Sequence, residues 1–237
     1  VTEANALAIE SAVAAGARRL IVSAIEHDSV QETARVLGVE VEILPVTADG
    51  RADLNWLKAR LTAWDRADGK PFVALMLANN ETGVIQPIHE ASEFVRAADG
   101  WLHVDAVQAA GKVIVDSRAL GADTLAISAH KLGGPQGVGA RTFGPCATLS
   151  RRQHGGGQER GRRGGTENVP GIAAFGAAAA EALKGLDEFA RQAVWRDAAG
   201  ERLKAMGGVV MGEAARRLAN TLCIATPGFA SDLQVDR

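Results

Sequence analysis

Apolar residues follow two alternating patterns along the first 145 residues of the chain. Short continuous apolar runs such as 72–77 and 101–106 are typical of strands that are buried in a sheet. Between them, segments such as 53–64 carry apolar residues at helical spacing, at Leu54, Leu57 and Leu61. Because strands separated by helices form parallel sheets, this alternation predicts an α/β domain with a mostly parallel sheet.

The individual elements can be placed by their turn and cap residues. We expect helices at 2–16, 29–38, 53–64 and 89–98, and strands at 19–26, 41–46, 72–77, 101–106, 124–129 and 137–143. Thr2 is the predicted N-cap of the first helix and Gly16 closes it. In such sheets ligands bind at the carboxyl ends of the strands, so this edge is where a site is expected.

The pattern changes after the last predicted strand. Residues 150–168 form a loop rich in arginine and glycine without periodicity, and an Ala-rich helical region runs from about 170 to 206. Two further strands are predicted at 208–212 and 220–226. We therefore divide the chain into a large domain at 1–168 and, at 169–237, a connecting helix with the beginning of a small domain.

Composition and charge exclude several classes of protein. The formal charge of −2 provides no basic field to attract nucleic acid, and the longest apolar runs are too short to span a bilayer. The two cysteines, Cys146 and Cys223, have no CxxC spacing, which suggests neither a disulfide framework nor a metal site. These features favour a cytoplasmic protein.

Polar residues gather where the predicted strands end. They are His27, Asn79, Asn80, Asp105, Gln108, Ser128, His130 and Lys131. Each has an ordinary structural alternative: a histidine in a loop is often solvated, an aspartate after a strand often caps a helix, and most lysines are solvated. Four strand ends that carry such groups together indicate a site on the rim of the sheet.

Pyridoxal phosphate (PLP) chemistry needs this combination of residue types. A lysine forms a Schiff base with the aldehyde of the coenzyme, and a carboxylate keeps the ring nitrogen protonated, so that the ring accepts electrons. The phosphate needs donors, which a helix N-terminus and hydroxyl groups supply. Lys131 and Asp105 suit the first two tasks. His27 suits stacking on the ring.

At this point the sequence resembles a known family. The motifs are "TEAN" (2–5), "IEHDSV" (25–30), "NNETGVIQP" (79–87), "HVDAVQAAGK" (103–112), "SAHKLGGPQGVG" (128–139) and "HGGGQERGRRGGTEN" (154–168). In this order they resemble the motif series of cysteine desulfurases, which are fold-type I PLP enzymes of the class V aminotransferase group. The resemblance implies a seven-stranded type of sheet, here without its first strand, and the start of a small α+β domain.

The resemblance also implies roles for single residues. Lys131 would bind the coenzyme and then move protons, Asp105 would pair with the ring nitrogen, and Gln108 would donate to the ring hydroxyl. His27 would stack on the ring and assist proton transfer. Asn80 would lie near the substrate carboxylate.

The remaining implied roles concern the phosphate and the assembly. Thr2, Ser128 and His130 would hold the phosphate, and Thr166 would reach the phosphate of a neighbouring subunit, which implies a homodimer. Members of the family convert L-cysteine to L-alanine and leave a persulfide. The sulfur goes to an acceptor or scaffold protein for iron–sulfur cluster or thio-cofactor assembly.

One part of the family pattern is missing. The family nucleophile lies in a loop of the type "SSGSAC", and no such stretch occurs in the sequence. Cys146 lies at the wrong place in the motif order, and Cys223 reads as a buried, inert thiol within an apolar strand. The chain therefore resembles a central fragment of a desulfurase, and we expect it not to turn over cysteine by itself.

Two alternatives remain beside the desulfurase. One is a selenocysteine lyase or another PLP enzyme of the class V group. The other is a chain without enzymatic activity that dimerises or docks onto a sulfur-acceptor protein. The arginines of the loop at 150–168 also resemble an RNA-binding segment, but no aromatic residue is interleaved for base stacking.

Overall fold

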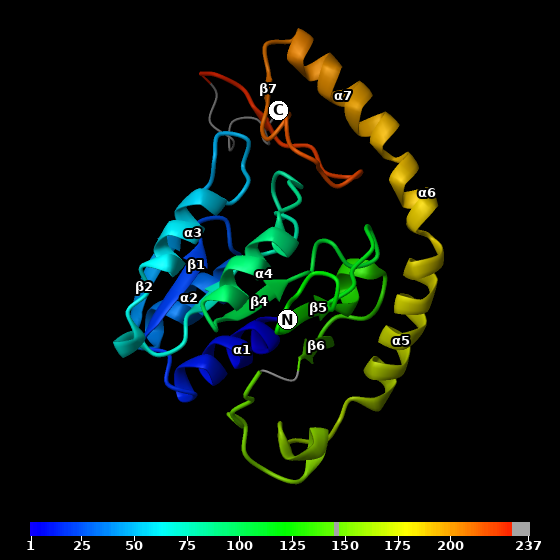
Figure 1. Ribbon diagram of the computed structural model, residues 1–237. Helices are drawn as coiled ribbons and strands as arrows, with labels where there is room; N and C mark the ends of the chain where they lie inside the picture. Colours follow the sequence, from blue (N-terminus) through cyan, green and yellow to red (C-terminus); the bar gives the residue numbers. More distant parts are fainter. Residues whose placement is uncertain (145–146, 229–237) are drawn as a thin grey trace.

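The protein is built around one six-stranded sheet. The computed structural model describes residues 1–144 and 147–228. The strands are β1 (Arg19–Ser23), β2 (Glu40–Leu44), β3 (Phe72–Ala74), β4 (Trp101–Asp105), β5 (Thr124–Ser128) and β6 (Gly139–Phe143). Their order is β2-β1-β3-β4-β5-β6, with the first five parallel and β6 antiparallel to β5 (Figure 1). This confirms the predicted α/β fold with a mostly parallel sheet.

Helices cover both faces of the sheet (Figure 1). Leu20 and Val22 of β1 pack with α1 (Thr2–Ala14) and α2 (Asp28–Val36) on one face. Ile21, which points the opposite way, packs with α3 (Leu54–Thr62) and α4 (Ile88–Ala97) on the other. Because both faces are buried, the central strands need apolar residues at every position, which explains their continuous apolar runs.

Some predicted boundaries are wrong in detail. Thr2 is the first residue of α1 and not its cap, because Val1 occupies the N-cap and supplies no side-chain hydrogen bond. β1 ends at Ser23 and β3 at Ala74, earlier than the apolar runs suggest. The chain after β3 nevertheless continues along β4, since the backbone N–H of Leu77 donates to the carbonyl of Asp105 at 2.9 Å.

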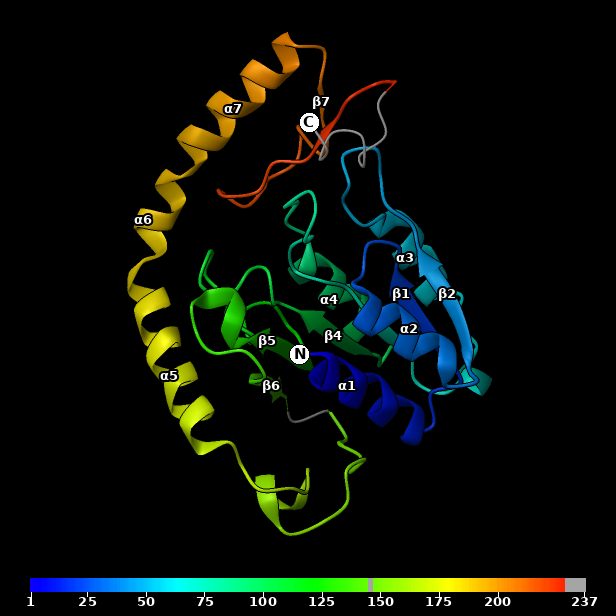
Figure 2. The same cartoon turned by 180° about the vertical axis from the view of Figure 1, so that it is seen from behind.

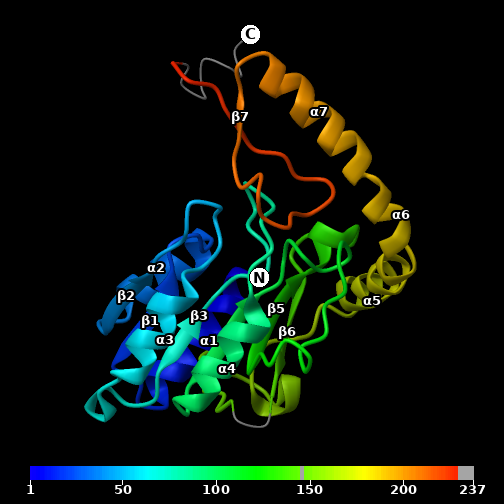
Figure 3. The same cartoon turned by 45° about the horizontal axis from the view of Figure 1, so that its top comes forward.

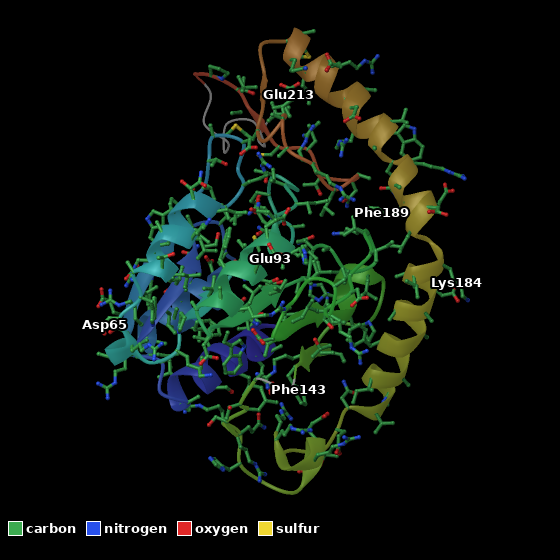
Figure 4. All side chains as sticks on the ribbon, in the orientation of Figure 1. Asp65, Glu93, Phe143, Lys184, Phe189 and Glu213 are labelled. Carbon is green, nitrogen blue, oxygen red and sulfur yellow. The ribbon has the colours of Figure 1, made fainter. Side chains whose placement is uncertain are left out.

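The loop at 150–168 is tied to α1 by ion pairs. Arg163 contacts Glu3 at 2.7 Å and Arg152 contacts Glu10 at 2.9 Å. The guanidinium of Arg162 lies over the ring of Phe143 of β6, 4.7 Å from the ring centre. Phe143 is labelled in Figure 4. Three arginines of the loop thus have partners within the chain, which supports a structural use of this segment.

The predicted long helical region consists of three helices. They are α5 (Val169–Lys184), α6 (Leu186–Arg191) and α7 (Ala193–Ala205). They follow one another in a curved run along one side of the molecule (Figures 1 and 2). The Asn168 side chain caps α5 by accepting from the N–H of Gly171 at 3.2 Å. Lys184 lies on the exposed outer side of this run (Figure 4).

The chain then returns to the sheet domain. β7 (Val209–Val210) and β8 (Ile224–Ala225) form an antiparallel pair that is shorter than the predicted strands. The segment between them approaches the loop after β3 (Figure 3), where the N–H of Leu218 donates to the carbonyl of Gly83 at 2.9 Å. The buried Leu218 belongs to the core of the sheet domain. The predicted division at 168 stays a prediction.

The two cysteines and the helices were the subject of further predictions. Cys223 precedes β8 and is half-buried, so the prediction of a buried thiol within a strand is wrong. Cys146 lies outside the described residues. None of the helices in the described part of the chain combines the length and the apolar composition that a membrane span requires.

Candidate functional site

The polar residues singled out in the sequence lie at one edge of the sheet. His27 follows β1, Asn80 follows β3, Asp105 ends β4, and Lys131 follows β5. These four strands are consecutive neighbours and run parallel, so their carboxyl ends form one rim. The topology therefore brings the predicted residues of four strand ends together.

Asp105 is a nearly buried carboxyl group, only 5% exposed. Its Oδ1 accepts from the backbone N–H of Val107 at 2.9 Å, and its Oδ2 accepts from the Asn5 amide at 2.7 Å. Burial raises the pKa of Asp105, whereas these two hydrogen bonds act in the opposite direction. The carboxylate caps a turn and no helix, and it keeps lone pairs free for another donor.

His27 is held in one tautomer by local geometry. It is the N-cap of α2, and its Nδ1 accepts from the backbone N–H of Ser29 at 3.0 Å. A nitrogen that accepts carries no proton, so the neutral ring has its proton on Nε2. The side chain is exposed at the rim, as stacking on a ligand requires.

Lys131 lies in a short 3₁₀ helix, Ala129–Leu132, directly after β5. In the same segment the hydroxyl of Ser128 is 2.7 Å from Nδ1 of His130. Lys131 is exposed, and its positive charge lowers the pKa of Lys112, in addition to the larger effect of burial on Lys112. The two ammonium groups therefore share one region of the rim.

Gln108 is oriented by Lys112. The ammonium of Lys112 donates to Oε1 of Gln108 at 2.8 Å. Because this bond occupies the oxygen, the amide N–H groups of Gln108 point elsewhere and remain able to donate. A donor at this position is what the predicted contact with a ring hydroxyl requires.

Asn80 owes its position to its neighbour. The Asn79 side chain accepts from the N–H groups of Glu81 at 3.0 Å and Thr82 at 2.9 Å, which closes the turn. Asn80 is half-buried and donates to Glu81 at 2.7 Å. Asn79 thus shapes the loop, and Asn80 is the one presented at the rim.

Thr2 and Thr166 are the remaining predicted residues. Thr2 is exposed in the first turn of α1, where backbone N–H groups have no helical partner. Thr166 is exposed on the wall of a cavity of about 810 Å³ that is also lined by Val1, Glu3 and Arg141. Within the described residues no hydrogen bond connects Thr166 to the other predicted site residues.

Two buried polar residues at the site were not predicted. Asn5 is fully buried and contacts Asp105. Glu26 is 6% exposed, its Oε1 accepts from the N–H of Met76, and its Oε2 has no hydrogen-bond partner among the described residues. Burial raises the pKa of Glu26 well above its ordinary value, and the charge of Asp105 raises it further. Both residues belong to motifs that also contain a predicted site residue. Asn5 lies in the motif of Thr2, and Glu26 lies in the motif of His27.

A mostly parallel sheet with a lysine and an aspartate at adjacent strand ends is typical of the α/β proteins that bind ligands at the carboxyl ends of their strands. The aminotransferase class-V family model matches residues 1–235. The chain therefore belongs to the class V aminotransferase family, which is PLP-dependent.

Curated relatives of the chain are named cysteine desulfurases. The chain is 39% identical over 230 residues to the protein of Cereibacter sphaeroides and 39% identical over 231 residues to that of Bradyrhizobium diazoefficiens. Each match covers 94% of this chain and 58% of the relative. The chain thus spans a little over half the length of these curated relatives.

Solved structures agree on the fold. A NifS-like protein from Rickettsia africae superposes with a TM-score of 0.91 at 30% identity, covering 99% of this chain and 64% of that one. DndA from Streptomyces lividans gives 0.83 at 31% identity, covering 99% and 68%. SspA, whose structure is a complex with cysteine, gives 0.77 at 27% identity, covering 100% and 66%.

Proposed function

We propose that these residues form the coenzyme-binding part of a PLP-dependent cysteine desulfurase. The observation that carries the proposal is the placement of the Asp105 carboxylate and the Lys131 amine at the carboxyl ends of the adjacent parallel strands β4 and β5. The polar groups around these two residues fit PLP. They are an amine, a buried carboxylate with free lone pairs, an exposed imidazole and an amide that can still donate a hydrogen bond.

Each contact of the coenzyme has a candidate partner. Lys131 would bind its aldehyde, Asp105 its ring nitrogen, and Gln108 its ring hydroxyl. Ser128 and His130, with the hydroxyl of Thr2 and the first N–H groups of α1, would bind its phosphate, as helix N-termini bind anions. When bound, PLP supplies a ring that accepts electrons from the bond that is broken.

The protein groups then bind substrate and move protons. The Lys131 amine would be the base that exchanges a proton with Cα of the substrate, L-cysteine. His27 would stack on the ring and assist proton transfer, with its Nε2–H available to donate a hydrogen bond. Asn80 would lie near the substrate carboxylate and could donate to it.

The assembly belongs to the same proposal. We infer a homodimer in which Thr166 reaches the phosphate of the neighbouring subunit, and a sulfur-acceptor or iron–sulfur scaffold protein as partner, in the cytoplasm. Exposed apolar side chains along α5 and α7 support an interface there; Val169 is 65% and Trp195 74% exposed.

Absorbance spectroscopy tests coenzyme binding. We expect the purified chain mixed with PLP to show an absorbance band near the edge of the visible range that remains after gel filtration. Lys131→Ala should abolish this band, whereas Lys184→Ala, which removes an exposed lysine of α5 (Figure 4), should leave it unchanged. A wild-type chain without the band, or a Lys131→Ala chain that keeps it, would refute the proposal.

We do not expect the chain alone to convert cysteine to alanine. Neither cysteine lies in a loop of the family type, and Cys223 directly precedes β8. Incubation of the PLP-loaded chain with L-cysteine and quantification of alanine checks this prediction. Formation of alanine and persulfide from cysteine would show that the expectation of an inactive chain is wrong.

A further inference from the structure

A buried network of hydrogen bonds joins the strand rim to α1, and Asn5 lies at its centre. The amide Nδ2 of Asn5 donates to Oδ2 of Asp105 at 2.7 Å and to the hydroxyl of Ser29 at 2.9 Å. Its Oδ1 lies 3.1 Å from Nε2 of His103. Asn5 and His103 are fully buried, so water does not compete for these contacts.

The donors of this network all point in one direction. Trp101 Nε1 donates to the hydroxyl of Thr124 at 3.1 Å, and this hydroxyl lies 2.9 Å from Nδ1 of His103. Burial lowers the pKa of His103 to about 3, so the ring is neutral and carries one proton. Since Oδ1 of Asn5 can only accept, this proton lies on Nε2 of His103, and Nδ1 then accepts from the Thr124 hydroxyl.

The orientation of the Asn5 amide follows from its contact with Asp105. An ionised carboxylate only accepts hydrogen bonds, so the NH₂ group of Asn5 faces Asp105 and Ser29, and its Oδ1 faces His103. The reversed amide would place its oxygen against the carboxylate, which is repulsive. His103 matches this orientation when it presents Nε2–H to Oδ1.

We propose that Asn5 is the positioning residue of this site, which keeps the Asp105 carboxylate ionised and turned toward the ring nitrogen of the coenzyme. This inference rests on the proposed function. Burial disfavours the charge of Asp105, and Glu26 is a second carboxyl group close enough to interact with it. The hydrogen bonds from Val107 and Asn5 lower the pKa of Asp105 more than the charges of His27 and of the N-terminal ammonium do. A donor to the charged form is therefore what such a carboxylate needs.

Asn5 also connects Asp105 with His27. The hydroxyl of Ser29, which accepts from Asn5, is 3.0 Å from Nδ1 of His27. The backbone N–H and the hydroxyl of Ser29 share the one lone pair of this nitrogen. One amide thereby links the residue that pairs with the coenzyme ring and the residue that stacks on it.

The test is the titration of Asp105 in the ligand-free chain, followed through its carboxyl ¹³C resonance. Loss of a hydrogen bond to a carboxylate raises its pKa, and we expect Asn5→Ala to shift the midpoint upward by about one unit. Asn5→Asp keeps an oxygen for His103 but places a second carboxyl against Asp105, so we expect a larger upward shift. If Asn5→Ala does not fold, Asn5→Asp, which preserves the volume, decides the question.

The control is Ser11→Ala. Ser11 is buried on the same helix and bonds to the carbonyl of Leu7, without contact to Asp105. We expect Ser11→Ala to leave the titration midpoint of Asp105 unchanged. If Asn5 has a purely structural role, the two Asn5 variants will lower the melting temperature and also leave the midpoint of Asp105 unchanged. That result would overturn the inference. Because the titration needs no PLP, its outcome is separate from the coenzyme-binding test, whose failure would refute the proposed function alone.

Discussion

At the scale of single residues, two buried carboxyl groups near the rim differ in their partners. Asp105 accepts two hydrogen bonds, from Val107 and Asn5, whereas Glu26 accepts one from Met76 and has a second oxygen without a partner among the described residues. Asp105 is thus the group suited to carry charge, and Glu26 the group suited to remain protonated, because like charges side by side are disfavoured.

The pH dependence of stability tests the state of Glu26. The pKa of Glu26 is raised in the folded chain, so above its ordinary value of 4.5 the unfolded chain loses a proton that the folded chain retains. The wild type therefore loses stability relative to Glu26→Gln as pH rises through this window, by at most about 1.4 kcal/mol per pH unit. Urea unfolding of both chains across this range measures the difference.

The matched control for this prediction is Glu93→Gln. Glu93 lies on α4 with its side chain 62% exposed, at the position labelled in Figure 4. The difference in the free energy of unfolding between Glu93→Gln and the wild type should change little across this pH range. If the stability of Glu26→Gln instead runs parallel to that of the wild type, Glu26 is ionised in the fold and our reading of this pair is wrong.

At the scale of elements, the loop after β3 is supported by the segment between β7 and β8. Gly83 has a φ of +73°, and a Cβ atom added to it would lie 2.7 Å from Cβ of Thr221. The backbone N–H of Ile85 donates to the carbonyl of Arg216 at 2.8 Å. The segment from the C-terminal part of the chain therefore holds the loop that presents Asn80.

Substitution of Gly83 tests this support. Gly38 has a similar φ of +70° and no atom within 4 Å of an added Cβ, so Gly38→Ala measures the cost of the backbone conformation alone. We expect Gly38→Ala to lower the free energy of unfolding by about 1 kcal/mol. Gly83→Ala should lower it by roughly 1–2 kcal/mol more, because the added Cβ collides with Thr221. Chemical denaturation of both variants measures the two costs. Equal losses would show that the two segments are not packed as described.

The sequence predicted the elements of the sheet domain well, and the reason is physical. Buried parallel strands and amphipathic helices leave distinct apolar patterns, so each predicted strand and helix of this domain is present. Cap geometry and the ends of strands depend on neighbouring backbone, which is why Thr2 is not a cap and β7 and β8 have two residues each. The positions of helix caps and strand ends are not marked by any pattern of apolar residues.

The site could be predicted only in part. His27, Asp105 and Lys131 were recognisable because their residue types and their places after strands indicate chemistry. Asn5 was not, because its role depends on a contact with a residue 100 positions away that no local pattern encodes. Glu26 was missed for the same reason, since burial of a charged residue follows from tertiary packing.

At the scale of the whole molecule, the site is assembled from distant parts of the chain. The start of α1, the ends of β1, β3, β4 and β5, and the support from the segment between β7 and β8 all contribute. Since none of these segments forms the rim alone, the proposed coenzyme binding would require the entire fold. We propose Lys131 as the amine that this assembly presents to the coenzyme.

Borohydride reduction followed by peptide mass spectrometry tests this claim most directly. Sodium borohydride converts a lysine-bound aldehyde into a stable secondary amine, so the modified lysine can be identified in a protease digest. We expect one equivalent of PLP to label the peptide that contains Lys131. A label that is absent from this peptide, or that is spread over exposed lysines such as Lys184, would contradict it.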